Sequence, residues 1–273
     1  MNEQIIQRSD AKLLLRNWPA EPASRACICL VHGLGEHSGR YQHVAEYFNR
    51  AGFSVGAFDL RGHGRSSGKR GDCTNYSILL DDIQEVLEYV VNEYQNQPCI
   101  LYGHSFGGNL VLNFALRRES PADLLVATSP MLRTAQPVPA WKRAMGRILK
   151  HIAPGFRLRN GIDLDDLSSD PEIGKAYRND ELNHSFVSVR LAYDMIESGS
   201  WALNNAGLLR QPLLLMHGSD DRITSPQAST EFAQRAGKLC TYKLWRGMRH
   251  ELHNEFEHDS VLSYIAQWIS GHL

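Results

Sequence analysis

The sequence predicts an α/β fold with a mostly parallel central sheet, helices on both faces and a helical insertion. Short apolar runs alternate with segments whose apolar residues recur at helical spacing, which is typical of a parallel sheet covered on both sides. The alternation stops at 131 and resumes near 205. A gap of about 70 residues is too long for a loop in a compact domain. We therefore expect a core of residues 1–130 and 206–273, with a cap or lid formed by residues 131–205.

Each element predicted in the first part of the chain follows from a local pattern. The run ACICLVHG at 26–33 is apolar, partly β-branched and ends in glycine, as a buried strand does. In the helix predicted over 41–52 the apolar residues share one face, and Gly52 occupies the C-cap position. FSVGAFDL at 53–60 is the next strand, and Asn75 can cap the helix that follows it.

The same alternation continues through the rest of the predicted core. Its elements are a strand at 99–105, a helix at 107–119, a strand at 123–129, a strand at 212–218, a helix near 226–236, a strand at 240–247 and a final helix with an apolar stripe from Val261 to Ile269.

Composition narrows the class of protein. The 29 basic and 30 acidic residues give a formal net charge of −1, so the overall charge gives no reason to expect nucleic-acid binding. The five cysteines show no CxxC spacing, and we interpret them as buried small side chains in a reducing compartment. The N-terminus lacks the apolar core of a signal peptide, and no run reaches the roughly 18 apolar residues of a membrane span. We expect a soluble cytoplasmic protein that needs no metal or organic cofactor.

The pattern glycine–any–serine–any–glycine occurs twice, and at most one of the two serines can be a nucleophile. Around Ser105, GHSFG follows a predicted strand and precedes a predicted helix, which is the context that a nucleophile elbow requires. The free N–H groups at the start of that helix favour negative charge near the serine. Ser66, in GRSSG, lies in a basic, glycine-rich loop with neither element. We therefore predict that Ser105 is the nucleophile.

A serine nucleophile needs a histidine to take its proton and a carboxylate to orient that histidine. An acidic loop, GSDDR, follows a predicted strand downstream; we favour Asp221 as the acid and keep Asp220 as the alternative. The loop after the last predicted strand contains His250, which we predict to be the base. His253 and His258 lie at or beyond the start of the final helix, where capping or a surface position is the simpler interpretation.

The negative charge that develops during ester cleavage also needs two backbone donors. One is expected to be the N–H of Phe106, which follows the nucleophile, and the other the N–H of Leu34, in the loop after the first buried strand. His32, at the start of that loop, is expected to brace it.

The predicted cap contains an amphipathic helix over 139–155. Its apolar residues, from Trp141 to Ile152, fall on one side, and its lysines and arginines fall on the other. We expect a lid helix whose apolar face covers the active-site cleft while its charges face water. The alternative is contact with a membrane or an anionic lipid headgroup, and the two roles are compatible. The acidic segment 162–177 has no metal-ligand spacing and is expected to be a solvated surface.

Together these motifs resemble the monoacylglycerol lipase branch of the α/β-hydrolases, which also includes lysophospholipase-like esterases. The matching segments cover nearly the whole chain outside the insertion: HGLGEHSGRY (32–41), GFSVGAFDLRGHGRSSGKRG (52–71), GHSFGG (103–108), GSDDR (218–222) and GMRHELHNE (247–255).

The resemblance implies an α/β-hydrolase fold with a helical cap, a Ser105–His250–Asp221 triad, and Leu34 and Phe106 as oxyanion-hole donors. The implied activity is hydrolysis of monoacylglycerols or similar single-chain esters through an acyl-enzyme. A lysophospholipase, a short-chain carboxylesterase and a peptidase of the proline-iminopeptidase type are the alternatives among enzymes. A catalytically inactive hydrolase fold that acts as a ligand receptor is the alternative from another class.

Overall fold

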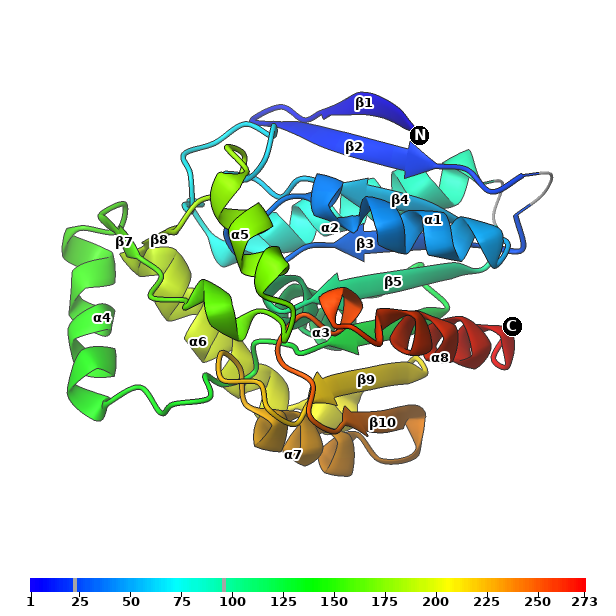
Figure 1. Ribbon diagram of the computed structural model, residues 1–273. Coiled ribbons are helices and arrows are strands. Elements are labelled where there is room, and N and C mark those ends of the chain that lie inside the picture. The colour runs from blue at the N-terminus through cyan, green and yellow to red at the C-terminus, as the bar shows by residue number, and fades with distance from the viewer. Residues whose placement is uncertain (22–23, 95–96) are drawn as a thin grey trace.

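The computed structural model describes residues 1–21, 24–94 and 97–273, and a central sheet runs through it (Figure 1). The strands of this sheet are β1 (Asn2–Gln7), β2 (Lys12–Trp18), β3 (Ala26–Val31), β4 (Phe53–Phe58), β5 (Cys99–His104), β6 (Leu124–Thr128), β9 (Leu213–Gly218) and β10 (Cys240–Trp245). Their order is β1-β2-β4-β3-β5-β6-β9-β10. All neighbouring pairs from β4 to β10 are parallel. The predicted α/β fold with a mostly parallel sheet is confirmed.

From β3 onward the helices alternate with these strands, apart from the segment between β6 and β9. They are α1 (Gln42–Arg50), α2 (Tyr76–Glu93), α3 (Phe106–Arg117), α4 (Ala140–Ile152), α5 (Pro171–Asn179), α6 (Val189–Asn204), α7 (Pro226–Ala236) and α8 (His258–Ser270). The predicted N-cap is present, since the Asn75 side chain accepts a hydrogen bond from the Ser77 N–H at 3.0 Å. The C-cap of α1 is Ala51, and Gly52 comes one residue later with φ of +85°.

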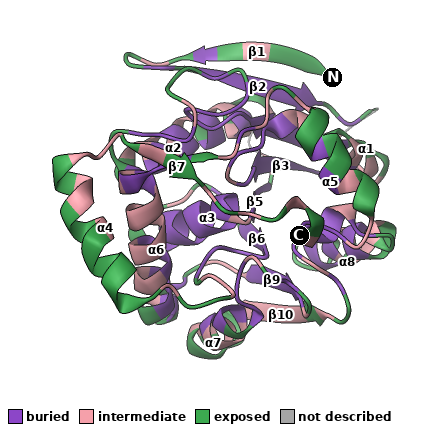
Figure 2. Cartoon of the chain, turned by 60° about the vertical axis from the view of Figure 1, so that its left-hand side comes forward, coloured by how far each residue is buried: buried purple, intermediate pink, exposed green. Residues whose placement is uncertain are grey.

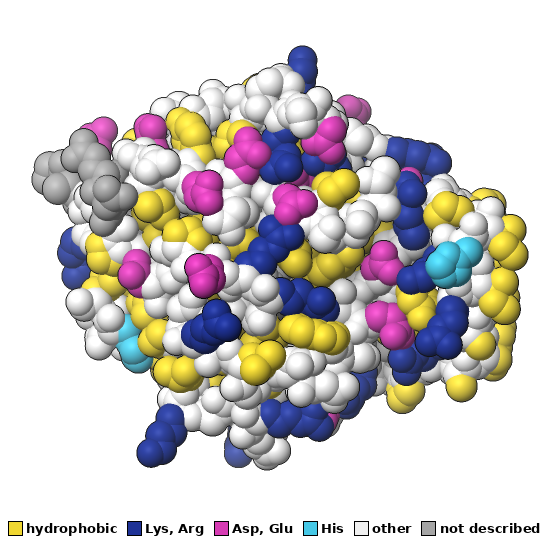
Figure 3. Space-filling view, turned by 180° about the vertical axis from the view of Figure 1, so that it is seen from behind, with side chains coloured by type: hydrophobic (Ala, Val, Ile, Leu, Met, Phe, Trp, Pro, Cys, Tyr) yellow, Lys and Arg dark blue, Asp and Glu magenta, His cyan; other side chains and the backbone are white. Residues whose placement is uncertain are grey.

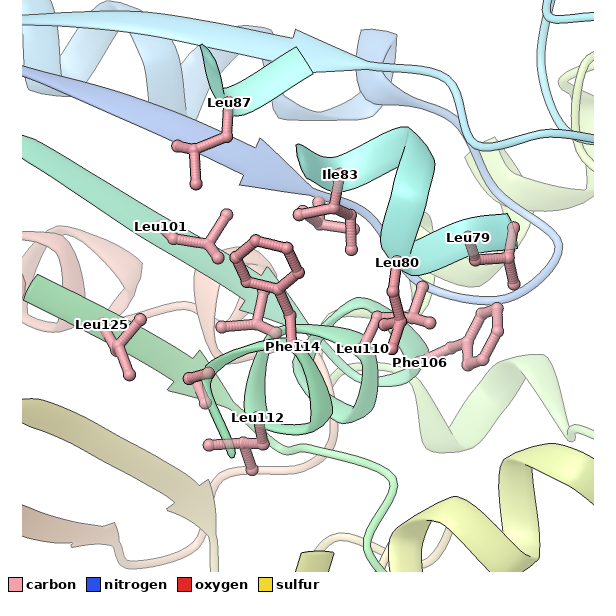
Figure 4. Packing of buried hydrophobic residues seen from close by; sticks show 14 of the residues in the cluster. Leu79, Leu80, Ile83, Leu87, Leu101, Phe106, Leu110, Leu112, Phe114 and Leu125 are labelled. Atoms are coloured by element: carbon pink, nitrogen blue, oxygen red, sulfur yellow. The ribbon is translucent and has the colours of Figure 1, made fainter. Parts of the chain in front are cut away.

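Alternation along each strand distributes the core over two faces of the sheet. In β3, Cys27 and Cys29 face the side covered by α2, α3 and α7, while Ile28 and Leu30 face α1 and α8. The strands β3, β4, β5, β6 and β9 and the inner helix faces are buried (Figure 2). Between α2 and α3 the packing is continuous, with Leu80 and Ile83 of α2 near Leu110 and Phe114 of α3 (Figure 4). This packing fixes α3, and with it the turn that precedes α3.

The two N-terminal strands are not anticipated by the alternation of strands and helices. β1 pairs antiparallel with β2, and β2 pairs antiparallel with β4, so the sheet is extended by an antiparallel edge. The residues of β1 are mostly exposed and polar, whereas β2 is buried almost throughout. The five cysteines are free thiols; Cys240 is half-buried and the other four are buried.

The segment 131–205 contains α4, α5 and α6 together with a small antiparallel sheet of β7 (Arg157–Arg159) and β8 (Phe186–Ser188). Helix α6 packs on α3, where the Asn113 side-chain amide donates to the Ser198 carbonyl at 3.2 Å. Helix α4 stands at the outer side of α6, on the left of Figure 1.

The expected orientation of the amphipathic helix is wrong. Trp141, Ile148 and Ile152 of α4 are 63%, 59% and 74% exposed, so the apolar face of the helix points to solvent and covers no cleft. Basic side chains of the helix lie toward α6 instead, which presents acidic partners to them: Arg143 pairs with Glu197 at 2.8 Å, and Lys150 pairs with Asp194 at 3.4 Å. Hydrophobic side chains consequently gather on the surface over α4, at the right-hand edge of Figure 3.

Candidate active site

Ser105 lies at the turn between β5 and α3, with a backbone conformation that non-glycine residues seldom adopt. Its φ of 54° and ψ of −113° mark a sharp, strained turn that lifts the side chain out of the sheet. Gly103 and Gly107 make this turn possible: a Cβ at Gly103 would collide with the carbonyl of Gly107, and one at Gly107 with the carbonyl of Val31. The GHSFG pattern thus meets a steric requirement of the strand-to-helix turn.

A hydrogen-bonded relay connects Ser105 to His250 and Asp221. Ser105 Oγ lies 2.9 Å from His250 Nε2, and His250 Nδ1 lies 2.7 Å from Asp221 Oδ2. If Nδ1 carries the proton and donates to the carboxylate, Nε2 is left to accept the serine proton. The three residues come from three separate loops, which follow β5, β9 and β10. The structure thus brings together all three predicted residues.

The Asp221 carboxylate is buried and surrounded by donors. Its Oδ1 accepts the N–H groups of Ile223 at 2.7 Å and Thr224 at 2.9 Å, and its Oδ2 accepts the Thr224 hydroxyl at 2.8 Å. His217 Nε2 also lies 3.0 Å from Oδ2. Burial alone would raise the pKa of Asp221, but His250 and His217, through charge and hydrogen bonds, hold this pKa well below its usual range. Asp221 is therefore ionised at neutral pH.

The His250 imidazole is buried among charged and aromatic neighbours. Burial lowers its pKa, but the charge and hydrogen bond of Asp221 and the charges of Glu251 and Glu36 outweigh this effect. The pKa of His250 is therefore raised above 6.5. The arrangement favours a protonated imidazole once the serine proton has been transferred.

The rival residues make no hydrogen bond to Ser105, His250 or Asp221 within the described part of the chain. Asp220 is exposed, and its carboxylate accepts the Ser219 hydroxyl at 2.6 Å. Ser66 Oγ donates to the Asp59 carbonyl at 2.6 Å and accepts the Leu14 N–H at 2.9 Å, so it braces a loop. His253 is fully buried, with its ring stacked on Tyr41, and His258 is the first residue of α8.

The residues predicted to form the oxyanion hole line the same cavity as Ser105. Phe106 is the first residue of α3, where an N–H has no acceptor within the helix. Leu34 belongs to the loop after β3, and a Cβ at the preceding Gly33 would lie 3.3 Å from Ser105 Cβ. His32 braces this loop: its Nε2 accepts the Leu60 N–H, and its Nδ1 lies 2.8 Å from the Gly33 carbonyl oxygen.

Two cavities meet at Ser105 and Leu34. One has a volume of about 560 Å³ and is mainly apolar; its lining includes Val138, Met195 and Ile196. The other has a volume of about 520 Å³ and carries polar and charged side chains, among them Glu36, Arg159, Arg178, Asp180, Asn183 and Glu251. The relay therefore faces one mainly apolar cavity, whose lining also includes Lys142, Asp163, Asp166 and Arg222, and one cavity of mixed polar and apolar character, called the polar cavity below.

Within residues 1–21, 24–94 and 97–273, no group of three or more His, Cys, Asp or Glu side chains is arranged to hold a metal ion. None of the helices in these ranges is long and apolar enough to cross a membrane.

Some residues that contact the relay are not anticipated from the sequence. Thr224 binds Asp221, and its hydroxyl lies 3.3 Å from His250 Nδ1. His217 in β9 links Asp221 to Ser229 of α7. Neither residue stands in a motif, and only their contacts with Asp221 identify them.

Comparison with known proteins places this geometry in a family. The family model described as "Serine aminopeptidase, S33" matches residues 22–257. The monoacylglycerol lipase of Mycolicibacterium smegmatis is 34% identical over 258 residues, which cover 94% of this chain and 92% of that protein. An uncharacterised abhydrolase domain-containing protein of Dictyostelium discoideum is 39% identical over 269 residues; the match spans 97% of this chain but 28% of that longer protein.

Solved structures agree with the sequence matches. The crystal structure of Paleococcus ferrophilus monoacylglycerol lipase superimposes with a TM-score of 0.86 and 33% identity, covering 96% of this chain and 99% of the other. The fold, the family match and the relatives lead to one assignment: this chain is an α/β-hydrolase of the serine aminopeptidase S33 family, in the branch that contains the monoacylglycerol lipases.

Proposed function

We propose that this protein hydrolyses monoacylglycerols through an acyl-enzyme formed on Ser105. His250 takes the serine proton, Asp221 holds the imidazole and stabilises its cation, and the N–H groups of Phe106 and Leu34 bind the oxyanion. His250 then protonates the leaving alcohol and activates the water that releases the fatty acid. The only co-substrate of this reaction is water.

The observation that carries this proposal is the position of the relay between two unlike cavities. The apolar cavity suits a single acyl chain, and the polar cavity suits a small hydroxylated alcohol such as glycerol. An ester whose carbonyl lies at Ser105 would place one half in each cavity. The relatives named monoacylglycerol lipase support the same substrate class.

The cavity chemistry argues against an aminopeptidase. In the polar cavity a free amine would need an unpaired carboxylate, but there Glu36 and Glu251 both pair with Arg40, and Asp180 lies 2.7 Å from His37 Nε2. We expect glyceryl esters to be cleaved and aminoacyl arylamides to be left intact.

A lysophospholipid is the second candidate substrate. Arg159 and Arg178 line the polar cavity, and neither side chain has an ion-pair partner within the described part of the chain. Two such cations suit an alcohol half that carries a phosphate. Equal or faster cleavage of lysophosphatidylglycerol than of monoacylglycerol would favour this candidate.

The proposed nucleophile is tested with a chain-length series of monoacylglycerols and p-nitrophenyl esters. We expect Ser105→Ala to abolish fatty-acid release and labelling by a fluorophosphonate probe. Ser66→Ala, the matched change in the other pentapeptide, should keep both activities per folded molecule. Turnover or labelling that persists in Ser105→Ala would disprove the mechanism, and a folded wild type without labelling would favour an inactive receptor.

We also propose that residues 131–205 form a cap whose exposed apolar face contacts a lipid surface. This face consists of Trp141, Met145, Ile148 and Ile152 on α4. Val138 and Pro139, which precede α4 directly, line the apolar cavity. A helix lying on a lipid surface would therefore hold the cavity next to the substrate source.

This contact is tested by sedimentation with phosphatidylcholine–phosphatidylglycerol vesicles. We expect Ile148→Asp/Ile152→Asp to weaken vesicle binding while turnover of soluble p-nitrophenyl butyrate is unchanged. Leu208→Asp, at an exposed site outside the cap, is the matched control and should bind as wild type does. Wild-type binding by the double variant would exclude this face.

A further inference from the structure

A buried ionic cluster lies beside the proposed relay and takes no part in the mechanism above. The Arg40 cluster consists of Arg40, Glu36 and Glu251. Arg40 Nη1 and Nη2 contact the two carboxylate oxygens of Glu251 at 2.8 Å each, and Nη1 also pairs with Glu36. The side chains of Arg40, Glu36 and Glu251 are 10%, 2% and 3% exposed.

One carboxylate of the cluster holds the loop proposed to form the oxyanion hole. Glu36 Oε1 accepts the N–H of Gly33 at 2.6 Å and the hydroxyl of Tyr41 at 2.8 Å. Gly33 directly precedes Leu34, the proposed donor, and a Cβ at Gly33 would lie 2.8 Å from Glu36 Oε1 and 3.3 Å from Ser105 Cβ. The Glu36 carboxylate therefore holds the loop where it lies next to Ser105.

The other carboxylate belongs to the loop that carries the proposed base. Glu251 follows His250, and its Oε2 also accepts the Asn254 side-chain amide at 2.6 Å. Its backbone N–H donates to the Leu167 carbonyl at 2.7 Å. Displacement of Glu251 would move His250 relative to Ser105, because the two residues are adjacent in the chain.

Arg40 thus contacts both segments through one rigid group. A planar guanidinium can engage one carboxylate with two parallel bonds and still reach a second, which a lysine ammonium cannot do with the same geometry. A buried ion pair contributes little net stability compared with an apolar core, so stability alone does not explain the cluster. Its geometry is instead that of a brace between two loops.

We propose that Arg40 is a positioning residue that, through Glu36 and Glu251, sets the distance between the oxyanion loop and His250. This inference rests on the proposed function, because it assumes that both loops act on the same ester. A misplacement of about 1 Å is enough to lower turnover by about 100-fold. The consequence should appear mainly in kcat, because the spacing of the reacting groups changes while Arg40 itself lines neither cavity.

The cluster also acts on the proton affinity of the base. The groups around His250 are Asp221 and Thr224 at Nδ1, Ser105 at Nε2, the rings of His104 and His253 nearby, and the carboxylates of Glu251 and Glu36. The charge of Glu251 raises the pKa of His250. Glu251→Gln, which removes this charge, should therefore move the acid limb of the kcat profile to lower pH.

The experiment measures kcat, KM and the pH profile with soluble p-nitrophenyl butyrate on the full chain. We expect Arg40→Lys to lower kcat by about 10- to 100-fold with KM changed less than about threefold. Glu251→Gln should lower kcat and shift the acid limb downward. Arg118→Lys, which alters a surface pair with Asp81, is the matched control and should behave as wild type.

A double-mutant cycle keeps the proposal falsifiable even if one variant folds poorly. In Arg40→Lys/Glu251→Gln the two losses should be less than additive, because both break the same brace. If circular dichroism shows that one of these variants is unfolded, Glu36→Gln is measured in its place, because glutamine has nearly the same shape as glutamate. The proposal would be overturned if folded variants kept the kcat and the acid limb of the wild type, or if only their KM rose. Activity in Ser105→Ala would instead refute the proposed function.

Discussion

At the scale of single residues, Asp221 differs from its neighbour Asp220 in the number of hydrogen-bond donors around its carboxylate. Asp220 and Asp221 are adjacent and chemically identical, yet one carboxylate is exposed and the other is buried under Ile223, Thr224 and His217. A buried carboxylate without donors would become protonated, and the donors around Asp221 keep it charged. Only the charged form can hold His250 in the tautomer that accepts a proton from Ser105.

We predict that Asp221→Asn lowers kcat by about 10⁴-fold, because an amide favours the wrong tautomer of His250. Asp220→Asn changes an exposed side chain and should stay within about twofold of wild type. Steady-state hydrolysis of p-nitrophenyl butyrate measures both variants. Equal losses in the two variants would mean that the carboxylates share the function.

The three residues of the relay could be predicted because each follows a recognisable strand and the chain order is characteristic. Thr224, His217 and Arg40 could not, because their importance comes from contacts between loops far apart in the sequence. The burial of His253 could not be predicted either, because the sequence near a helix start does not determine the direction of a histidine side chain.

At the scale of elements, the turn from β5 into α3 depends on close backbone approach. Gly107 is buried against the end of β3, where a Cβ would collide with the carbonyl oxygens of Val31 and His32. The same contact holds the start of α3 close to the loop that contains Leu34. A side chain at this position would therefore separate the helix from the strand.

Gly107→Ala is expected to destabilise the protein by about 1–3 kcal/mol and to reduce turnover, because the backbone must move to accept the methyl group. Gly207→Ala is the matched control: its Cβ would have its nearest neighbour, the Arg235 carbonyl, at 3.7 Å. Urea unfolding followed by circular dichroism compares the two. A Gly107→Ala variant as stable as Gly207→Ala would show that α3 can shift freely.

Three elements were missed or wrongly oriented in the predictions from sequence, and each has a physical reason. β1 is a polar edge strand with no apolar alternation, and β2 runs antiparallel, so neither fits a series of parallel strands linked by helices. In α4 the amphipathic pattern defines two faces but not which one is inward. The acidic side chains of α6 decide that, and they lie about 50 residues away in the chain.

At the scale of the whole molecule, many imidazoles are kept neutral inside the fold. His104 lies between the rings of His250 and His253, and His63 lies 4.8 Å from the ring of His184. Burial lowers the pKa of His253 to about 3 and that of His184 to about 4, and it holds the pKa values of His63 and His104 well below 6.5. The unfolded chain would titrate these groups near 6.5.

The unfolded state therefore binds more protons than the folded state below pH 6.5, and stability must fall as the pH is lowered. Each such histidine costs about 1.4 kcal/mol per pH unit between its two pKa values, which is about 2 kcal/mol at pH 5 for His253. His250 acts in the opposite direction because its folded-state pKa is raised, but it is one group against several. Paired carboxylates such as Asp221 lose their contribution only at still lower pH.

We predict that the free energy of unfolding decreases steadily from pH 6.5 to pH 4.5. His253→Gln should reduce this slope by up to the contribution of one bound proton, which is about 1.4 kcal/mol per pH unit. The reason is that the variant lacks a ring that takes up a proton on unfolding in this pH range. His151→Gln, at an exposed position, is the matched control and should leave the slope unchanged. Urea titrations at four pH values measure the slope directly. A free energy that is flat over this range would show that the buried imidazoles accept protons in the folded state.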